Sequence, residues 1–166
     1  MINPPMKTSA NGRALIEAYE GLILSAYDDA TDRVVPAGGH VRGTLTIGYG
    51  HTSAAGLPRV YVGMAVTREE ADAILSSDLA AVEADVNHHV TVPISQDVFD
   101  ALVSFDFNVG ALDRSSTLHL INTGNLAAGA QALMLWDHAG GRVNAGLEKR
   151  RAAERDLMLT GKWRGP

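Results

Sequence analysis

Hydrophobic residues recur at helical spacing in two parts of the chain, one near its start and one covering most of its second half. The first part is predicted to form a helix that begins at Thr8 or Ser9, either of which can cap it, and that ends at Gly21. Its apolar positions, spaced three or four residues apart as a buried helix face requires, are Leu15, Ile16, Tyr19, Leu22 and Ile23.

After this helix the pattern changes to a period of two, which is typical of strands. Residues 44–49 alternate, so that Thr44 and Thr46 share one face of a predicted strand and apolar side chains occupy the other. Upstream, Gly38 and Gly39 have valines on either side, and this arrangement predicts a hairpin turn. The segment is therefore expected to form a small antiparallel sheet.

From Thr67 onward helical spacing returns. Thr67 and Glu70 form a capping box, in which each side chain accepts a hydrogen bond from the other residue's backbone N–H. Further helices are predicted to start after Ser95, after Ser115 or Ser116 and after Asn125, and a last one to run from about Leu147 to Gly161. One helix, a small sheet and then several helices predict an α+β fold with a mostly helical second lobe.

Composition limits the classes of protein to which the chain can belong. Its 166 residues make a single domain large enough to bury a core. The absence of cysteine excludes disulfides, thiolate metal ligands and a thiol nucleophile. The net charge of −5 argues against a nucleic-acid binder, although residues 142–166 carry seven basic against three acidic side chains.

The sequence has no apolar run of the roughly 20 residues that would span a bilayer, and its first residues do not resemble a secretory signal. We therefore expect no membrane anchor, and a protein that stays in the cytoplasm of the cell that makes it until another agent releases it.

Two carboxylic acids are the best candidates for chemistry. Glu20 is predicted at the end of a helix, where the partial negative charge of the helix disfavours an ionised carboxyl, as a proton donor requires. Asp29 follows in a polar run and would stay ionised, and the Thr46 hydroxyl would hold a water against it. Spacing alone does not distinguish this trio from a surface glutamate and a turn aspartate.

The neighbours of these residues are more specific. Residues 20–29 read Glu-Gly at a helix end followed, after eight intervening positions, by Asp29, and residues 46–51 read Thr-Ile-Gly-Tyr-Gly-His. This pattern resembles the phage-type lysozymes, glycoside hydrolase family 24. The resemblance covers about residues 9–160, and its further matches are residues 96–110, residues 116–118, Trp136, Gly140-Gly141 and residues 146–154.

The resemblance implies a lysozyme-like, two-lobed α+β fold. It comprises one catalytic domain, with a small antiparallel sheet lobe at about residues 20–66 and a mostly helical lobe at about residues 67–161 that includes the N-terminal helix. The implied substrate is bacterial peptidoglycan, cut at the β-1,4 bond between N-acetylmuramic acid and N-acetylglucosamine without a cofactor or metal. We expect a monomer that reaches the cell wall from the host cytoplasm through a holin-like pore.

Site residues carry over by position. Glu20 would protonate the leaving oxygen, while Asp29 and Thr46 would hold the attacking water or stabilise positive charge on the sugar. Phe107, Asn108 and Thr117 would bind substrate from the helical side. His51 would support the site by orienting the backbone and Glu20 through hydrogen bonds.

One departure from the family pattern affects the threonine. Sixteen residues separate Asp29 from Thr46, whereas about five do so in the family. We interpret the excess as a lengthened hairpin that leaves Asp29 and Thr46 together, with Thr44 as the alternative third residue.

Two other functions remain open. A lytic transglycosylase on the same fold would need the glutamate but no water-holding aspartate and threonine. A non-catalytic peptidoglycan-binding module would tolerate the long interval between Asp29 and Thr46.

Overall fold

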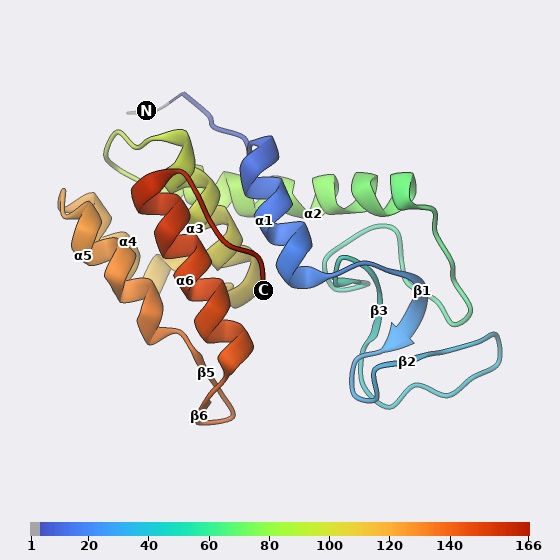
Figure 1. Cartoon of the computed structure of the whole chain (residues 1–166). Helices are drawn as coiled ribbons and strands as arrows, with labels where there is room; N and C mark the ends of the chain where they lie inside the picture. Colours follow the sequence, from blue (N-terminus) through green and yellow to red (C-terminus); the bar gives the residue numbers. More distant parts are fainter. Residues whose placement is uncertain (1–3) are drawn as a thin grey trace. The chain divides into compact units, whose positions relative to one another are not determined.

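The computed structural model describes residues 4–166 and divides into two compact units. The sheet unit comprises Glu20–Ala80, and the helical unit comprises the residues up to Tyr19 together with Ala81–Pro166. The division falls inside α2 (Arg68–His89), so the first half of that helix packs with the sheet unit. Figure 1 traces the order of the elements along the chain.

Helix α1 (Ala10–Glu20) has the ends that the sequence predicts. The Ser9 hydroxyl accepts hydrogen bonds from the N–H groups of Asn11 and Gly12, at 3.2 and 3.3 Å, and so caps the helix. Gly21, with a φ of 70°, ends it in the left-handed conformation that glycine adopts without strain. Leu22 and Ile23, which also matched the helical spacing, therefore lie beyond the helix.

The sheet unit contains one four-stranded antiparallel sheet in the order β2-β1-β3-β4. Its strands are β1 (Ile23–Asp28), β2 (Arg33–Val34), β3 (Leu45–Gly48) and β4 (His51–Thr52). Ala26, Ile47 and Met64 form its buried core, against which the partly buried Leu45, Val60 and Val66 pack. The predicted small antiparallel sheet is thereby confirmed.

The prediction of a lengthened hairpin with its turn at Gly38-Gly39 is wrong in detail. β2 pairs with β1, with Tyr27 opposite Val34, and the chain then crosses to the other side of β1 to enter β3. Residues 35–44 form this crossing as an irregular loop. The N–H of Val35 continues along β1 by donating to the Ala26 carbonyl, at 2.8 Å, so Val35 belongs beside β1.

The helical unit is built around α3 (Gln96–Val109) and α6 (Ala145–Thr160), and α3 is buried along most of its length. Around them lie α4 (Ser116–Asn122), α5 (Leu126–Ala132) and the short 3₁₀ segments η1 (Leu112–Arg114) and η2 (Leu133–Leu135). Strands β5 (His138–Ala139) and β6 (Arg142–Val143) form a hairpin across Gly140-Gly141.

Helix capping in this unit follows the sequence closely. Ser95, Ser115 and Asn125 each accept a backbone hydrogen bond as the N-cap of the helix that follows, and Gly161 ends α6 with a φ of 70°. Helix α6 begins two residues earlier than predicted, because the Asn144 side chain caps it by accepting from the N–H groups of Gly146 and Leu147. The α+β class is confirmed.

Within residues 4–166, no helix combines the length and the apolar character needed to cross a bilayer.

Candidate active site

Glu20 is the last residue of α1, and its side chain is partly exposed. The turn between β3 and β4 lies against it, since a β-carbon added to Gly50 would stand 3.5 Å from the Glu20 Oε2 atom. Gly50 has a φ of 85°, a conformation that favours glycine. The Gly-x-Gly sequence after Thr46 therefore brings the backbone close to this carboxyl group.

Asp29 continues the pairing of β1 with β3. Tyr27 lies opposite Thr46 and Asp28 opposite Leu45, and the Asp29 N–H donates to the Thr44 carbonyl at 3.1 Å. Residues directly opposite in an antiparallel ladder share a face, and so do their second neighbours along each strand. Asp29, Thr44 and Thr46 therefore lie on one face of the sheet, with Thr44 opposite Asp29 and Thr46 diagonal to it.

The two threonines differ in exposure. Thr46 is 4% exposed, and its hydroxyl donates to the Thr44 carbonyl at 3.2 Å. Thr44 has an exposed side chain and donates its backbone N–H to the Asp29 Oδ1 atom, at 2.5 Å. The hydroxyl oxygen of Thr46 keeps lone pairs that can accept from a water on the face it shares with Asp29.

Asp28, the residue before Asp29, has a carboxylate that holds the loop backbone in place. Its side chain is 2% exposed and accepts hydrogen bonds from the N–H groups of Arg42, Gly43 and Ala30, at 2.7, 2.9 and 3.0 Å. The N–H of Arg42 and, to a smaller extent, those of Gly43 and Ala30 hold the pKa of Asp28 below its ordinary value against the opposing effect of burial. Asp29, which is exposed, is thus the carboxylate left for chemistry.

His51 is buried in the same unit, and its ring has partners other than those predicted. Nδ1 lies 2.8 Å from an Asp78 carboxylate oxygen, and Nε2 lies 2.8 Å from the Pro58 carbonyl oxygen. Among the hydrogen bonds of the described residues, neither ring nitrogen reaches Glu20. Burial raises the pKa of Asp78, with His51 acting in the opposite direction.

His51 therefore anchors the turn that lies against Glu20. Its two hydrogen bonds join the loop after β4 to α2, and Tyr49 makes a parallel link through its hydroxyl to Asp72, at 3.0 Å. The turn that approaches Glu20 lies between these two anchored residues.

Phe107, Asn108 and Thr117, predicted to bind substrate, lie in the helical unit. Phe107 is partly exposed, and Asn108 is exposed and accepts a hydrogen bond from Arg151 at 3.0 Å. Thr117 is fully buried in the first turn of α4, and its hydroxyl has no hydrogen-bond partner among the described residues. A buried hydroxyl does not line a surface, so the sugar contact predicted for Thr117 is not available in this structure.

Sequence reasoning missed Asp28 and Gly43. A β-carbon on Gly43 would lie 2.1 Å from the Asp29 Oδ1 atom and 2.9 Å from the Ala30 nitrogen. The glycine is thus required by the close approach of the loop to the candidate aspartate. A glycine directly before the predicted strand at residues 44–49 was the available signal. No group of three or more acidic or histidine side chains within residues 4–166 is arranged to hold a metal ion.

The arrangement can supply a proton donor, a carboxylate and a hydroxyl along one strand. Asp29 lies where β3 begins, Thr46 lies within it, and Glu20 lies against the turn that follows it. All three belong to the sheet unit, so their arrangement is set within one compact body.

Comparison with known proteins shows which family the chain resembles. The family model described as phage lysozyme matches residues 17–154. The endolysin of Bacillus phage PZA is 39% identical over 158 residues, covering 94% of this chain and 56% of that protein. The endolysin of Salmonella phage P22 is 37% identical over 157 residues, covering 93% of this chain and 99% of that protein.

Solved structures show the same similarity. The muramidase domain of SpmX from Asticaccaulis excentricus superimposes with a TM-score of 0.78 at 38% identity, covering 93% of this chain and 98% of that chain. Other relatives carry the name SAR-endolysin, among them that of bacteriophage PS119, 40% identical over 124 residues, which cover 74% of this chain and 72% of that protein. The chain spans a little over half the length of the Bacillus phage relatives, and nearly all of the P22 protein.

Proposed function

Because this chain belongs to the phage lysozyme family, we propose that it is an endolysin that hydrolyses bacterial peptidoglycan and so lyses the cell. The bond cut is the β-1,4 linkage between N-acetylmuramic acid and N-acetylglucosamine. The observation that carries the proposal is that Asp29 and Thr46 share one face of the sheet while Glu20 lies against the turn after β3, all within one compact unit. Glu20 and Asp29 supply the pair of carboxyl groups that hydrolysis of a glycosidic bond uses, and Thr46 adds a hydroxyl that can hold the water.

Each residue has one role in this mechanism. Glu20 donates a proton to the leaving glycosidic oxygen as the bond breaks. The carboxylate of Asp29, together with the Thr46 hydroxyl, holds the attacking water or stabilises the positive charge that develops on the sugar. The four backbone N–H groups that Asp28 and Asp29 engage keep this end of β1 in place.

On the helical unit, Phe107 and Asn108 are the residues that we propose to contact substrate, since both reach the surface. Asn108 offers an amide whose oxygen is already oriented by Arg151, which leaves its N–H groups for a sugar or peptide carbonyl. His51 supports the site through the turn that approaches Glu20.

Digestion of purified sacculi in water enriched in heavy oxygen tests the reaction. Hydrolysis releases muropeptides with reducing ends that carry one heavy oxygen atom, which mass spectrometry detects. A lytic transglycosylase would release 1,6-anhydro ends without heavy oxygen, and a binding module would release no fragments. Either of those results would replace the hydrolase proposal.

We also propose that the protein accumulates in the host cytoplasm as a monomer and reaches the wall through a holin-like pore. Expression with and without a co-expressed holin tests this route. Lysis that requires the holin supports it, and equally fast lysis without one contradicts it.

A further inference from the structure

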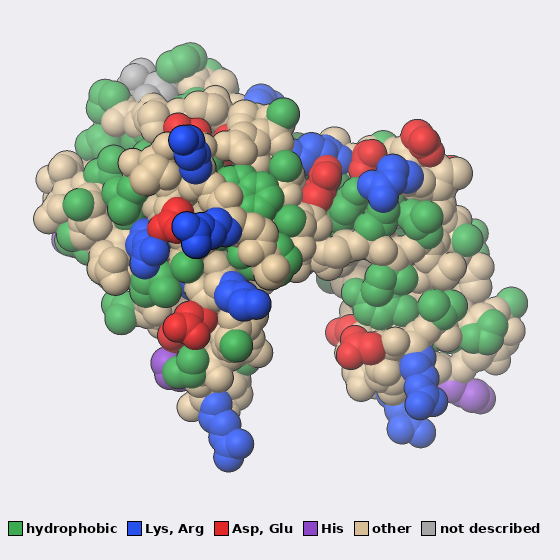
Figure 2. All heavy atoms as spheres, viewed as in Figure 1, with side chains coloured by type: hydrophobic (Ala, Val, Ile, Leu, Met, Phe, Trp, Pro, Cys, Tyr) green, Lys and Arg blue, Asp and Glu red, His purple; other side chains and the backbone are tan. Residues whose placement is uncertain are grey.

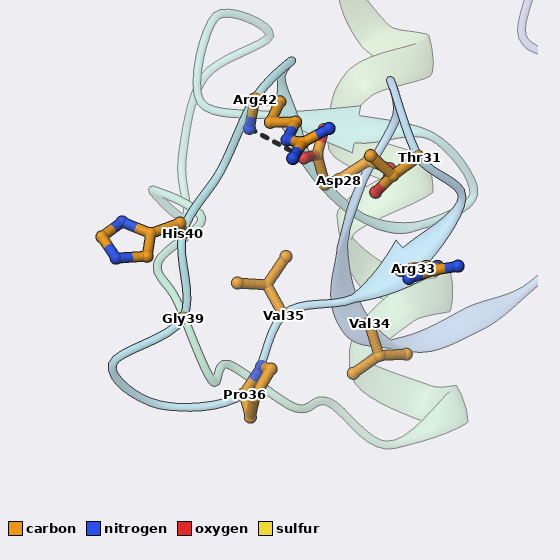
Figure 3. Close-up of a pocket in the computed structure, with 9 residues that line it drawn as sticks. All are labelled: Asp28, Thr31, Arg33, Val34, Val35, Pro36, Gly39, His40 and Arg42. Carbon is orange, nitrogen blue, oxygen red and sulfur yellow. Dashed lines mark hydrogen bonds between the residues drawn. The ribbon is translucent and has the colours of Figure 1, made fainter.

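The irregular loop that separates Asp29 from Thr46 borders an open cavity in the sheet unit, with a volume of about 500 Å³. Figure 3 shows the loop returning past β2, with Val35 directed toward the space that the loop borders and Asp28 at one end of it. The cavity is lined by Asp28, Thr31, Arg33, Val34, Val35, Pro36, Gly39, His40 and Arg42. Most of these residues lie between Asp29 and Thr46, in the segment that is longer in this chain than in the family pattern.

The loop is held at several points, so the cavity is formed before any ligand arrives. The N–H of Gly39 donates to the Pro36 carbonyl at 2.9 Å, and the N–H of Gly63 donates to the Val35 carbonyl at 3.0 Å. At the other end Asp28 fixes the N–H groups of Arg42 and Gly43. A preformed site loses less free energy on binding than a disordered loop would.

The charge around this cavity is positive. Arg33 and Arg42 are exposed, and no ion pair of either is found among residues 4–166. Asp28, the carboxylate on the lining, lies beside Arg42 in Figure 3, and the charge of Arg42 acts on it. Asp28 also accepts three backbone hydrogen bonds, which occupy most of its lone pairs. The ring of His40 points away from the cavity in Figure 3, so the two arginines supply its charge. A lining with two guanidinium groups and one carboxylate favours an anionic ligand, and a planar carboxylate fits the fork of donors of a guanidinium group.

The lining also includes the apolar residues Val34, Val35 and Pro36. A ligand that combines aliphatic groups with carboxylates matches both kinds of group. The peptide stems of peptidoglycan have this chemistry, whereas phosphate alone has no apolar part.

The position of the cavity fits a stem attached to a bound glycan strand. Asp28 and Asp29 are consecutive, so their side chains point to opposite faces of β1, one toward the cavity and the other toward Thr46. An extended peptide covers about 3.3 Å per residue, so a stem of a few residues can pass from one face to the other around the turn after β1.

We infer that this cavity binds a carboxylate of the peptidoglycan peptide stem, and that the long loop is a substrate-binding element. The inference rests on the proposed function for the identity of the polymer. Arg33 and Arg42 pair with the carboxylate, and Val34, Val35 and Pro36 contact the aliphatic part of the stem.

Titration of the stem tripeptide, followed by NMR or calorimetry, tests the inference without requiring turnover. The Glu20→Gln protein serves as the host, and the double variant Arg33→Gln/Arg42→Gln is compared with Arg59→Gln, which removes an exposed arginine of the same unit outside the cavity. We expect the double substitution to weaken tripeptide binding at least about tenfold and Arg59→Gln to leave it unchanged.

Two further probes need no change in the cavity. The tripeptide with amidated carboxylates should bind the unsubstituted cavity at least about tenfold more weakly than the free acid. Tripeptide binding that is undetectable, insensitive to amidation, or equal in the two arginine variants overturns the inference. Inorganic phosphate that binds more tightly than the tripeptide also overturns it. Failure of the proposed function would appear separately, as wild-type protein that releases no fragments from sacculi.

Discussion

Asp28 and Asp29 are consecutive residues whose carboxylates bind the backbone of one three-residue segment, residues 42–44. Asp28 accepts from the N–H groups of Arg42 and Gly43, and Asp29 accepts from the N–H of Thr44. Because their side chains leave β1 on opposite faces, the returning loop is held from both sides. This pair explains how sixteen intervening residues leave Asp29 and Thr46 in neighbouring positions on one face of the sheet.

Gly43→Ala should reduce catalytic activity more than stability. The added methyl group would overlap the Asp29 Oδ1 atom, at 2.1 Å, and press on the backbone nitrogen of Ala30, so the Asp29 carboxylate must move. We expect kcat on sacculi to fall at least about tenfold, since small displacements of a catalytic group are costly. Gly165→Ala, where an added β-carbon would meet no atom within 4 Å, is the matched control. Equal kcat values for the two variants would contradict this assignment of Gly43.

Asp28→Asn should make the free energy of unfolding depend less on pH between neutral and acid conditions. The folded-state pKa of Asp28 lies below its ordinary value, so the ionised group stabilises the fold at neutral pH, and this contribution is lost as the pH falls through the folded-state value. Thermal unfolding between pH 7 and pH 2 should therefore show a difference between wild type and variant that is largest at pH 7 and vanishes in acid.

Asp32→Asn is the control for this series, since Asp32 is exposed and an asparagine tolerates its φ of 52°. A difference between wild type and Asp28→Asn that persists undiminished at pH 2 would mean that the side chain acts through its shape rather than its charge.

Local sequence signals predicted most of the helix ends. The capping box of Thr67 and Glu70 forms as predicted, with hydrogen bonds of 2.7 and 3.1 Å between side chains and backbone. Ser95 caps α3 in the same way. These interactions join residues three positions apart, so the pattern that identifies them lies within a short window of sequence.

The loop after β2 could not be predicted in this way. Its course depends on Asp28 bonding to backbone 14 and 15 residues away, which no periodic pattern records. Likewise His51 pairs with Asp78, 27 residues further along the chain, in place of the nearby glutamate that its position suggested. The candidate catalytic residues were predicted because residues 20–29 and 46–51 form two short motifs that resemble the phage-type lysozymes, whereas the contacts that support them are long-range.

Among the substrate-binding candidates of the helical unit, Thr117 is buried whereas Phe107 and Asn108 reach the surface, and the sequence did not indicate this difference. Thr117 follows the N-cap Ser115 and lies under α5, where a β-carbon on Gly129 would stand 3.1 Å from the Thr117 carbonyl oxygen. A polar residue in the first turn of a short helix looks exposed in the sequence, but the close approach of α5 buries it.

Glu154→Ala should destabilise the protein severely. Its carboxylate is fully buried and accepts hydrogen bonds from Ser104 at 2.8 Å, Arg151 at 2.9 Å and Arg150 at 3.3 Å. Removing it leaves two buried guanidinium groups without their shared carboxylate, which costs about 3–5 kcal/mol. Urea unfolding of this variant and of Glu148→Ala, an exposed acid on the same helix, measures the difference. A loss below about 1 kcal/mol for Glu154→Ala would be incompatible with an essential buried network.

Glu20→Gln should abolish catalysis while preserving the fold. Glutamine keeps the size of the side chain beside Gly50 but has no proton to give to a glycosidic oxygen. A general acid typically contributes a factor of about 10²–10⁴, so the release of muropeptides should fall at least a hundredfold. The control is Glu17→Gln, three residues earlier on α1, where the carboxylate pairs with Arg13 at 2.6 Å. That variant should retain full activity. Thermal unfolding of both variants establishes that they are folded, and a folded Glu20→Gln protein that degrades sacculi at near the wild-type rate would remove Glu20 from the mechanism.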